Sequence, residues 1–157
     1  PAQTSYWRTT MTTFNHAREI PAPVDQVFAA FSDPARLARW WGPAGFTNTF
    51  SVCEFRTGGR WVFVMHAPNG RDFPNESVFA EVVAPGRVVV EHASEPRYRL
   101  TITLAATPPA AGKAAGTVVT WSQAFAKPET AKALEHIVLP ANEQNLDRLA
   151  AEVARAV

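Results

Sequence analysis

The chain has 157 residues, of which 46% are apolar and 18% are charged. This apolar share can fill a sizeable core, so the composition excludes a disordered or low-complexity protein. The 15 Lys and Arg residues nearly balance the 14 Asp and Glu residues, which leaves a formal net charge of only +1. Such a balance excludes a strong general attraction to nucleic acid or to an anionic membrane.

The sequence contains no apolar run near the roughly 20 residues that span a bilayer, and no signal-peptide core. Cys53 is the only cysteine, so no disulfide can form within the chain, and a reducing compartment is expected. We therefore expect a single domain over residues 1–157, with a loose leader at 1–6, in the cytoplasm and without a membrane or nucleic-acid partner.

The first elements are a strand and two short helices. Residues 7–20 are rich in threonine and aromatic side chains and favour a strand. An amphipathic helix follows, because Val24, Val27, Phe28 and Phe31 have helical spacing. A second short helix is predicted by Asp33 as its cap and a proline at its first position.

From residue 46 onward the apolar pattern changes to a period of two, which is typical of strands joined by tight turns. Six strands are predicted, at 46–56, 60–67, 75–84, 87–93, 97–106 and 117–125. A long helix then follows Pro128, and Pro140 predicts either a kink or two helices in series.

This order, β-α-α-β6-α, predicts an α+β fold in which a curved antiparallel sheet of about seven strands wraps around the C-terminal helix. We expect a curved sheet to leave a cavity of a few hundred Å³ beneath that helix. Alternation of apolar and polar residues along the strands, and the apolar face of the helix, predict the lining of this cavity. The candidate ligand-binding residues are Trp40, Trp61, Phe63, Met65, Val90, His92, Ile102, Trp121, Gln123, Asn142 and Leu146.

The strand at 75–84 can be oriented in two ways, because each of its two faces carries one carboxylate. If Glu76 faces inward, it could hold His92 across the sheet and make it a general base, so these two residues are the catalytic candidates. The alternative interpretation is an ordinary hydrogen bond within the core.

Other chemistries lack their sequence signals. The chain has no HExxH or CxxC motif, no glycine-rich phosphate loop and no GxSxG elbow, so we expect neither a metal nor a cofactor.

Several segments together resemble a known family. They are RWWGPAGFTNTF (39–50), FRTGGRWVFVMHAPNG (55–70), PNESVF (74–79), AEVVAPGRVVVEH (80–92), TVVTWSQAF (117–125) and LDRLAAEV (146–153). They are similar to the family named after the activator of heat-shock protein 90 ATPase, within the START or birch-pollen-allergen-like (SRPBCC) superfamily. The resemblance implies a helix-grip fold with an apolar cavity between the sheet and the C-terminal helix.

Superfamily members include lipid and hormone binders as well as polyketide cyclases and dehydratases. The resemblance therefore implies three functions: binding of a small apolar or amphipathic ligand, an enzyme of cyclase, dehydratase or hydrolase type, or a chaperone-interacting module. Ligand binding is our leading hypothesis. The chain is too short for the additional domain of the co-chaperone, so we expect a small-molecule partner rather than a chaperone, with a homodimer left open.

Overall fold

The computed structural model describes residues 12–108, 112 and 114–155. Its strands are β1 (Thr12–Ile20), β2 (Thr47–Cys53), β3 (Arg60–His66), β4 (Asp72–Val83), β5 (Arg87–His92), β6 (Tyr98–Ala106) and β7 (Thr117–Phe125). Its helices are α2 (Val24–Ser32), α3 (Pro34–Trp40) and α4 (Pro128–Arg155). None of these helices is long and apolar enough to cross a membrane.

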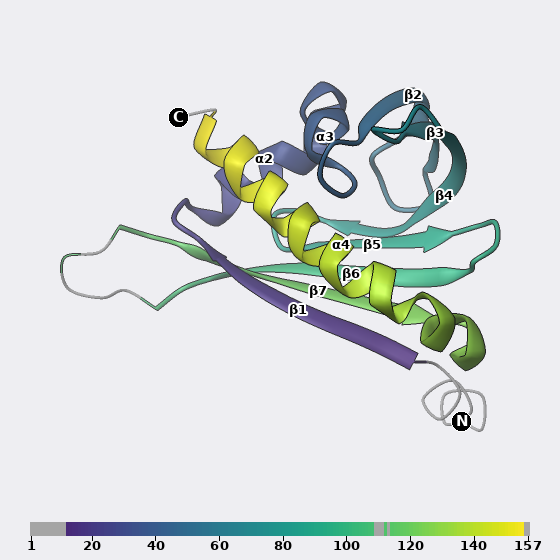
Figure 1. Cartoon of the computed structure of the whole chain (residues 1–157). Coiled ribbons are helices and arrows are strands. Elements are labelled where there is room, and N and C mark those ends of the chain that lie inside the picture. Colours follow the sequence, from purple (N-terminus) through teal and green to yellow (C-terminus); the bar gives the residue numbers. More distant parts are fainter. Residues whose placement is uncertain (1–11, 109–111, 113, 156–157) are drawn as a thin grey trace.

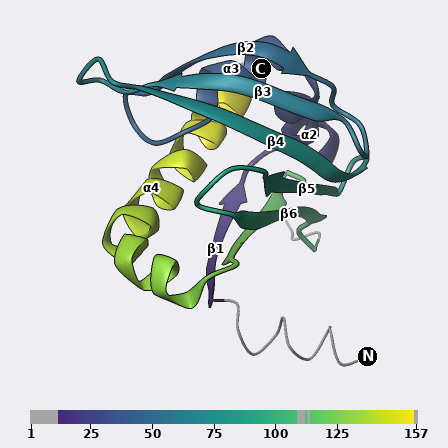
Figure 2. The same ribbon diagram turned by 90° about the vertical axis from the view of Figure 1, so that its right-hand side faces the viewer.

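The strands form one antiparallel sheet in the order β1-β7-β6-β5-β4-β3-β2. Strands β2 to β7 follow one another as a meander, and β1 completes the sheet beside β7. The sheet is strongly curved, and α4 runs across its concave side (Figures 1 and 2). The short helices α2 and α3 cover the end of the sheet near the C-terminal end of α4 (Figure 1).

The predicted α+β architecture is confirmed, and the observed strands lie within a few residues of the predicted ones. Residues 1–6, expected as a leader, lie outside the described residues, as do residues 7–11 of the predicted first strand. The alternative of two helices in series is wrong, because α4 continues through Pro140 as one helix. Asp33 caps α3 as expected: its side chain accepts a hydrogen bond of 3.0 Å from the backbone N–H of Ala35.

Two irregularities bend the sheet. The pairing register shifts between Phe50 and Val52 in β2, and again between Phe79 and Glu81 in β4. An extra residue in one strand bends that strand and increases the local twist. The shift at Ala80 also changes which side chains face inward, so that Phe79 is buried before it and Val82 packs on the core after it.

Aromatic rings fill the core below the C-terminal half of α4. Trp41 lies at its centre, with ring centroids 5.5 Å from Trp40, 4.8 Å from Trp61 and 5.7 Å from Trp121. These pairs adopt the edge-to-face and tilted geometries that aromatic quadrupoles favour. This tryptophan cluster occupies much of the volume between helix and sheet.

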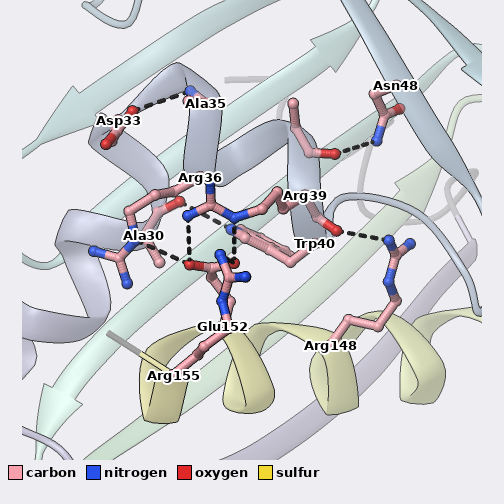
Figure 3. Close-up of polar contacts among 11 residues, drawn as sticks. Ala30, Asp33, Ala35, Arg36, Arg39, Trp40, Asn48, Arg148, Glu152 and Arg155 are labelled. Carbon is pink, nitrogen blue, oxygen red and sulfur yellow. Dashed lines mark hydrogen bonds and ion pairs between the residues drawn. The ribbon is translucent and has the colours of Figure 1, made fainter. Parts of the chain in front are cut away.

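A buried carboxylate fastens the last turns of α4 to α3. Glu152 accepts hydrogen bonds from Arg36 at 3.1 Å and from Arg39 at 2.9 and 3.0 Å, and Arg155 lies 3.5 Å away (Figure 3). The hydrogen bond from Arg39 is the largest cause that lowers the pKa of Glu152 below its ordinary value of 4.5. These four residues, the Glu152 cluster, join the C-terminal turns of α4 to α3.

We expect Glu152→Gln to lower the free energy of unfolding by about 1–3 kcal/mol, because it leaves the mostly buried guanidinium of Arg36 without its counter-charge. Urea denaturation at pH 7 measures this loss. Folding lowers the pKa of Glu152, so its ionised form stabilises the protein above pH 4.5, and this contribution is lost as the pH falls below that value. The variant should therefore lose less stability than the wild type on acidification.

The matched control is Glu135→Gln, an exposed position on the same helix that makes no ion pair with any described residue. It should change the free energy of unfolding by less than about 0.5 kcal/mol. Equal effects of the two substitutions would show that the Glu152 cluster does not hold α4.

Candidate functional site

A cavity of about 150 Å³ lies between the middle of α4 and the concave face of the sheet. We call it the α4 cavity. Its walls come from the α3–β2 loop, from β3, β6 and β7, and from α4. The lining residues are Trp41, Gly42, Pro43, Met65, Tyr98, Leu100, Trp121, Gln123, Ile137, Val138, Ala141, Asn142 and Asn145.

The α3–β2 loop, residues 41–46, is held in place by polar side chains of α4. Arg148 donates hydrogen bonds of 2.7–3.2 Å to five backbone carbonyls, of residues 39, 41, 42, 43 and 46. Asn145 donates to the carbonyl of Trp40 at 3.0 Å and accepts from the N–H of Gly42 at 3.2 Å. Because α4 and this loop both line the cavity, these bonds set the distance between two of its walls.

Gly42 is required where the loop passes over β3. Its φ is +98°, in the region that side-chain-bearing residues rarely adopt, and a Cβ there would lie 2.7 Å from Cε of Met65. A side chain here would strain the backbone and displace the end of Met65, so glycine is favoured where the loop reaches the cavity wall.

Two of the three buried amides that line the cavity bond to each other. Asn142 and Gln123 are each 8% exposed, and the Asn142 side chain donates a hydrogen bond of 3.0 Å to that of Gln123. Among the described residues, neither the Gln123 amino group nor the Asn142 carbonyl oxygen has a hydrogen-bond partner. Both atoms are therefore available to bond water or a ligand in the cavity.

Four of the eleven predicted ligand-binding residues line the α4 cavity: Met65, Trp121, Gln123 and Asn142. The others are buried but do not line it, namely Trp40, Trp61, Phe63, Val90, His92, Ile102 and Leu146. The physical reason is the tryptophan cluster, which fills the space under the C-terminal half of α4. For the same reason the cavity is smaller than the few hundred Å³ expected.

The proposed His92–Glu76 pair is not formed. The Glu76 side chain is 60% exposed and lies 3.6 Å from Arg60 on the outer face of the sheet. His92 is buried as predicted, but its ring nitrogens contact the carbonyl of Pro96 at 2.8 Å and the side-chain oxygen of Asn75 at 2.9 Å. The two catalytic candidates therefore lie on opposite faces, and the acid–base arrangement expected from the sequence is wrong.

Several lining residues were missed by the sequence analysis. Tyr98 and Leu100 share one face of their strand, and Asn145 follows Asn142 at helical spacing. The sequence pattern could therefore have identified Tyr98 and Asn145 as inward-facing. Trp41 follows Leu37 at helical spacing on the apolar side of α3, but this spacing does not place it at the cavity, because it is the C-cap residue where the chain leaves the helix. Its position depends on the fold of the α3–β2 loop.

Metal and thiol chemistry find no support in the described residues. They contain no group of three His, Cys, Asp or Glu side chains able to hold a metal ion. Cys53 is partly buried on β2, and burial raises the pKa of its thiol, which disfavours the reactive thiolate.

The phenol of Tyr98 reports on the polarity of the cavity. Its ring stacks on His92 with centroids 4.8 Å apart, and burial raises the pKa of Tyr98 to about 12 from an ordinary value of 10.0. A low-dielectric environment disfavours the phenolate, as expected beside an apolar cavity.

We expect Tyr98 to ionise near pH 12. Its ionisation is measured by titrating the absorbance at 295 nm of the wild type and of Tyr98→Phe and subtracting the second curve from the first. Because the folded pKa is raised, the neutral phenol stabilises the fold below pH 10, and this contribution is lost as the pH rises towards 12. Circular dichroism at each pH checks that the chain is folded. Ionisation near pH 10 in the folded protein would contradict an apolar surrounding of this ring.

Comparison with solved structures supports the fold. The crystal structure of a Nitrosomonas europaea protein matches with a TM-score of 0.77 at 23% identity, covering 92% of this chain and 96% of that one. The solution structure of an Arthrobacter aurescens protein gives a TM-score of 0.77 at 23% identity, with 91% and 86% covered. The solution structure of the AHSA1-like protein of Aeromonas hydrophila gives 0.66 at 22% identity, with 91% and 94% covered.

No significant match is found among curated proteins. A family model, by contrast, matches residues 21–154, from the turn before α2 almost to the end of α4. This match includes the α3–β2 loop and every residue that lines the α4 cavity. The chain belongs to the family described as Activator of Hsp90 ATPase homolog 1-like protein.

Proposed function

We propose that this protein binds a small, mainly apolar molecule in the α4 cavity. The observation that carries this proposal is the composition of the wall, which is aromatic and aliphatic with a single pair of incompletely bonded amides. Ligand pockets combine apolar walls with a few polar groups that orient the ligand. The free donor and the free acceptor of this amide pair are available to orient such a ligand.

The arrangement of α4 provides a route for entry. Ile137 lines the cavity and is 56% exposed, so the cavity reaches the surface at this part of the helix. On the β1 side α4 is fastened by ion pairs of Arg18 with Asp147 at 2.6 Å and with Glu143 at 3.1 Å. A ligand therefore enters past Ile137 rather than between α4 and β1.

A protein-docking function has less support. Among the described residues, the large exposed apolar side chains are Phe73, Val83, Ile137 and Leu139. Phe73 and Val83 lie at opposite ends of β4, and the other two are on α4. They do not form the single broad apolar patch that a stable protein interface would need.

To test the proposal, toluene, phenol and hexan-1-ol are titrated into the protein while the indole N–H signals of Trp41 and Trp121 are followed by NMR. We expect saturable binding of at least one of these compounds. Ala141→Leu extends a side chain from α4 into the cavity and should weaken that binding at least about tenfold, since it occupies volume that the ligand needs.

The matched control is Ala133→Leu, the same substitution at an exposed position two turns earlier on α4. It should leave binding unchanged. Native mass spectrometry of freshly purified protein adds an independent measurement, because a resident small molecule would appear as a mass increment. Absence of saturable binding by every compound, together with no increment, would contradict the proposal.

A further inference from the structure

We propose that the α4 cavity selects a neutral molecule with a single aromatic ring and a substituent that both donates and accepts a hydrogen bond, such as a carboxamide or a hydroxyl. This inference rests on the proposed function and specifies the class of ligand. Three features of the cavity carry it: the unmet atoms of its amide pair, the absence of ionised side chains from its wall, and its volume and aromatic lining.

The amide pair defines the hydrogen bonding. One bond joins Asn142 to Gln123, which leaves the amino group of one amide and the carbonyl oxygen of the other without a partner among the described residues. Exchanging nitrogen and oxygen in both amides reverses the bond and again leaves one donor group and one acceptor. The wall therefore offers both functions whichever way the amides are assigned. A carboxamide or hydroxyl group satisfies both, whereas a hydrocarbon satisfies neither.

The charge of the wall excludes an ionised ligand. Within the described part of the chain, no Lys, Arg, His, Asp or Glu side chain lines the cavity. A carboxylate entering it would lose its hydration without a counter-charge, and only the free donor of the amide pair could bond it, because the free acceptor would repel it. The raised pKa of Tyr98 agrees with a wall that disfavours negative charge.

Volume and shape limit the ligand to one ring. The cavity measures about 150 Å³, and an engineered apolar cavity of about this size in another protein accepts benzene. Trp41 and Trp121 line it with ring centroids 5.7 Å apart and planes inclined by 35°, and Tyr98 adds a third aromatic surface. Flat aromatic walls favour a flat ligand, because ring–ring contacts add to the burial of apolar area.

The test compares benzamide, toluene and benzoate, which share one ring and differ in the polar group. Dissociation constants are measured at pH 7 from the indole N–H signals of Trp41 and Trp121. We expect benzamide to bind the wild type at least about tenfold more tightly than toluene, because only benzamide meets both free amide atoms. Benzoate should bind at least about tenfold more weakly than benzamide.

The double variant Gln123→Leu/Asn142→Leu replaces both amides by apolar side chains of similar size. It should bind toluene at least as tightly as the wild type does and lose the preference for benzamide. Its unfolding transition shows whether the variant is folded, and toluene binding shows whether its cavity remains open.

The outcomes separate this inference from the proposed function. If toluene and benzamide bind the wild type equally well, the cavity binds apolar molecules, but the polar group of the ligand does not bond the amide pair. The inference is then wrong. The same holds if the double variant keeps the preference for benzamide. If none of the three compounds binds, both the inference and the proposed function are wrong.

Discussion

The contact of Arg148 with the α3–β2 loop sets the distance between α4 and the opposite wall of the cavity. This guanidinium makes no ion pair with any described residue and instead binds five backbone carbonyls. Burial lowers its pKa from an ordinary 12.5, and the carbonyl dipoles offset part of that cost. The loop carries Trp41 and Pro43, and the helix carries Ala141 and Asn142, so Arg148, together with Asn145, holds two walls of the cavity at a fixed separation.

Local periodicity explains why part of the fold and site could be predicted. The alternation that places Trp121 and Gln123 on one face of β7 depends only on neighbouring residues, as does the spacing that places Asn142 on the inner face of α4. The same rules identified Trp61 and Ile102 as buried. They could not tell that these two belong to the core, because the boundary between core and cavity depends on how tryptophans from α3, β3 and β7 fill the space together.

The face that Glu76 occupies was left open for a different reason. Both faces of the predicted strand carried one carboxylate, so alternation alone could not orient it. The extra residue at Ala80 removes the conflict, because the faces exchange there and both Glu76 and Glu81 reach the outer surface, near Arg60 and Arg87. Such a register shift cannot be located from the composition of the strand or from its pattern of apolar residues. The register shift becomes evident only from the pairing of β4 with its partner strand β5.

That irregularity in β4 also constrains how the gene can change. Loss of the single codon for Ala80 would restore unbroken alternation while leaving Phe79 on the inner face and Glu81 on the outer face. With Ala80 in place, a deletion elsewhere in β4 would instead turn the residues on one side of it to the opposite surface. In an alignment with distant relatives, a gap in this strand therefore belongs at Ala80.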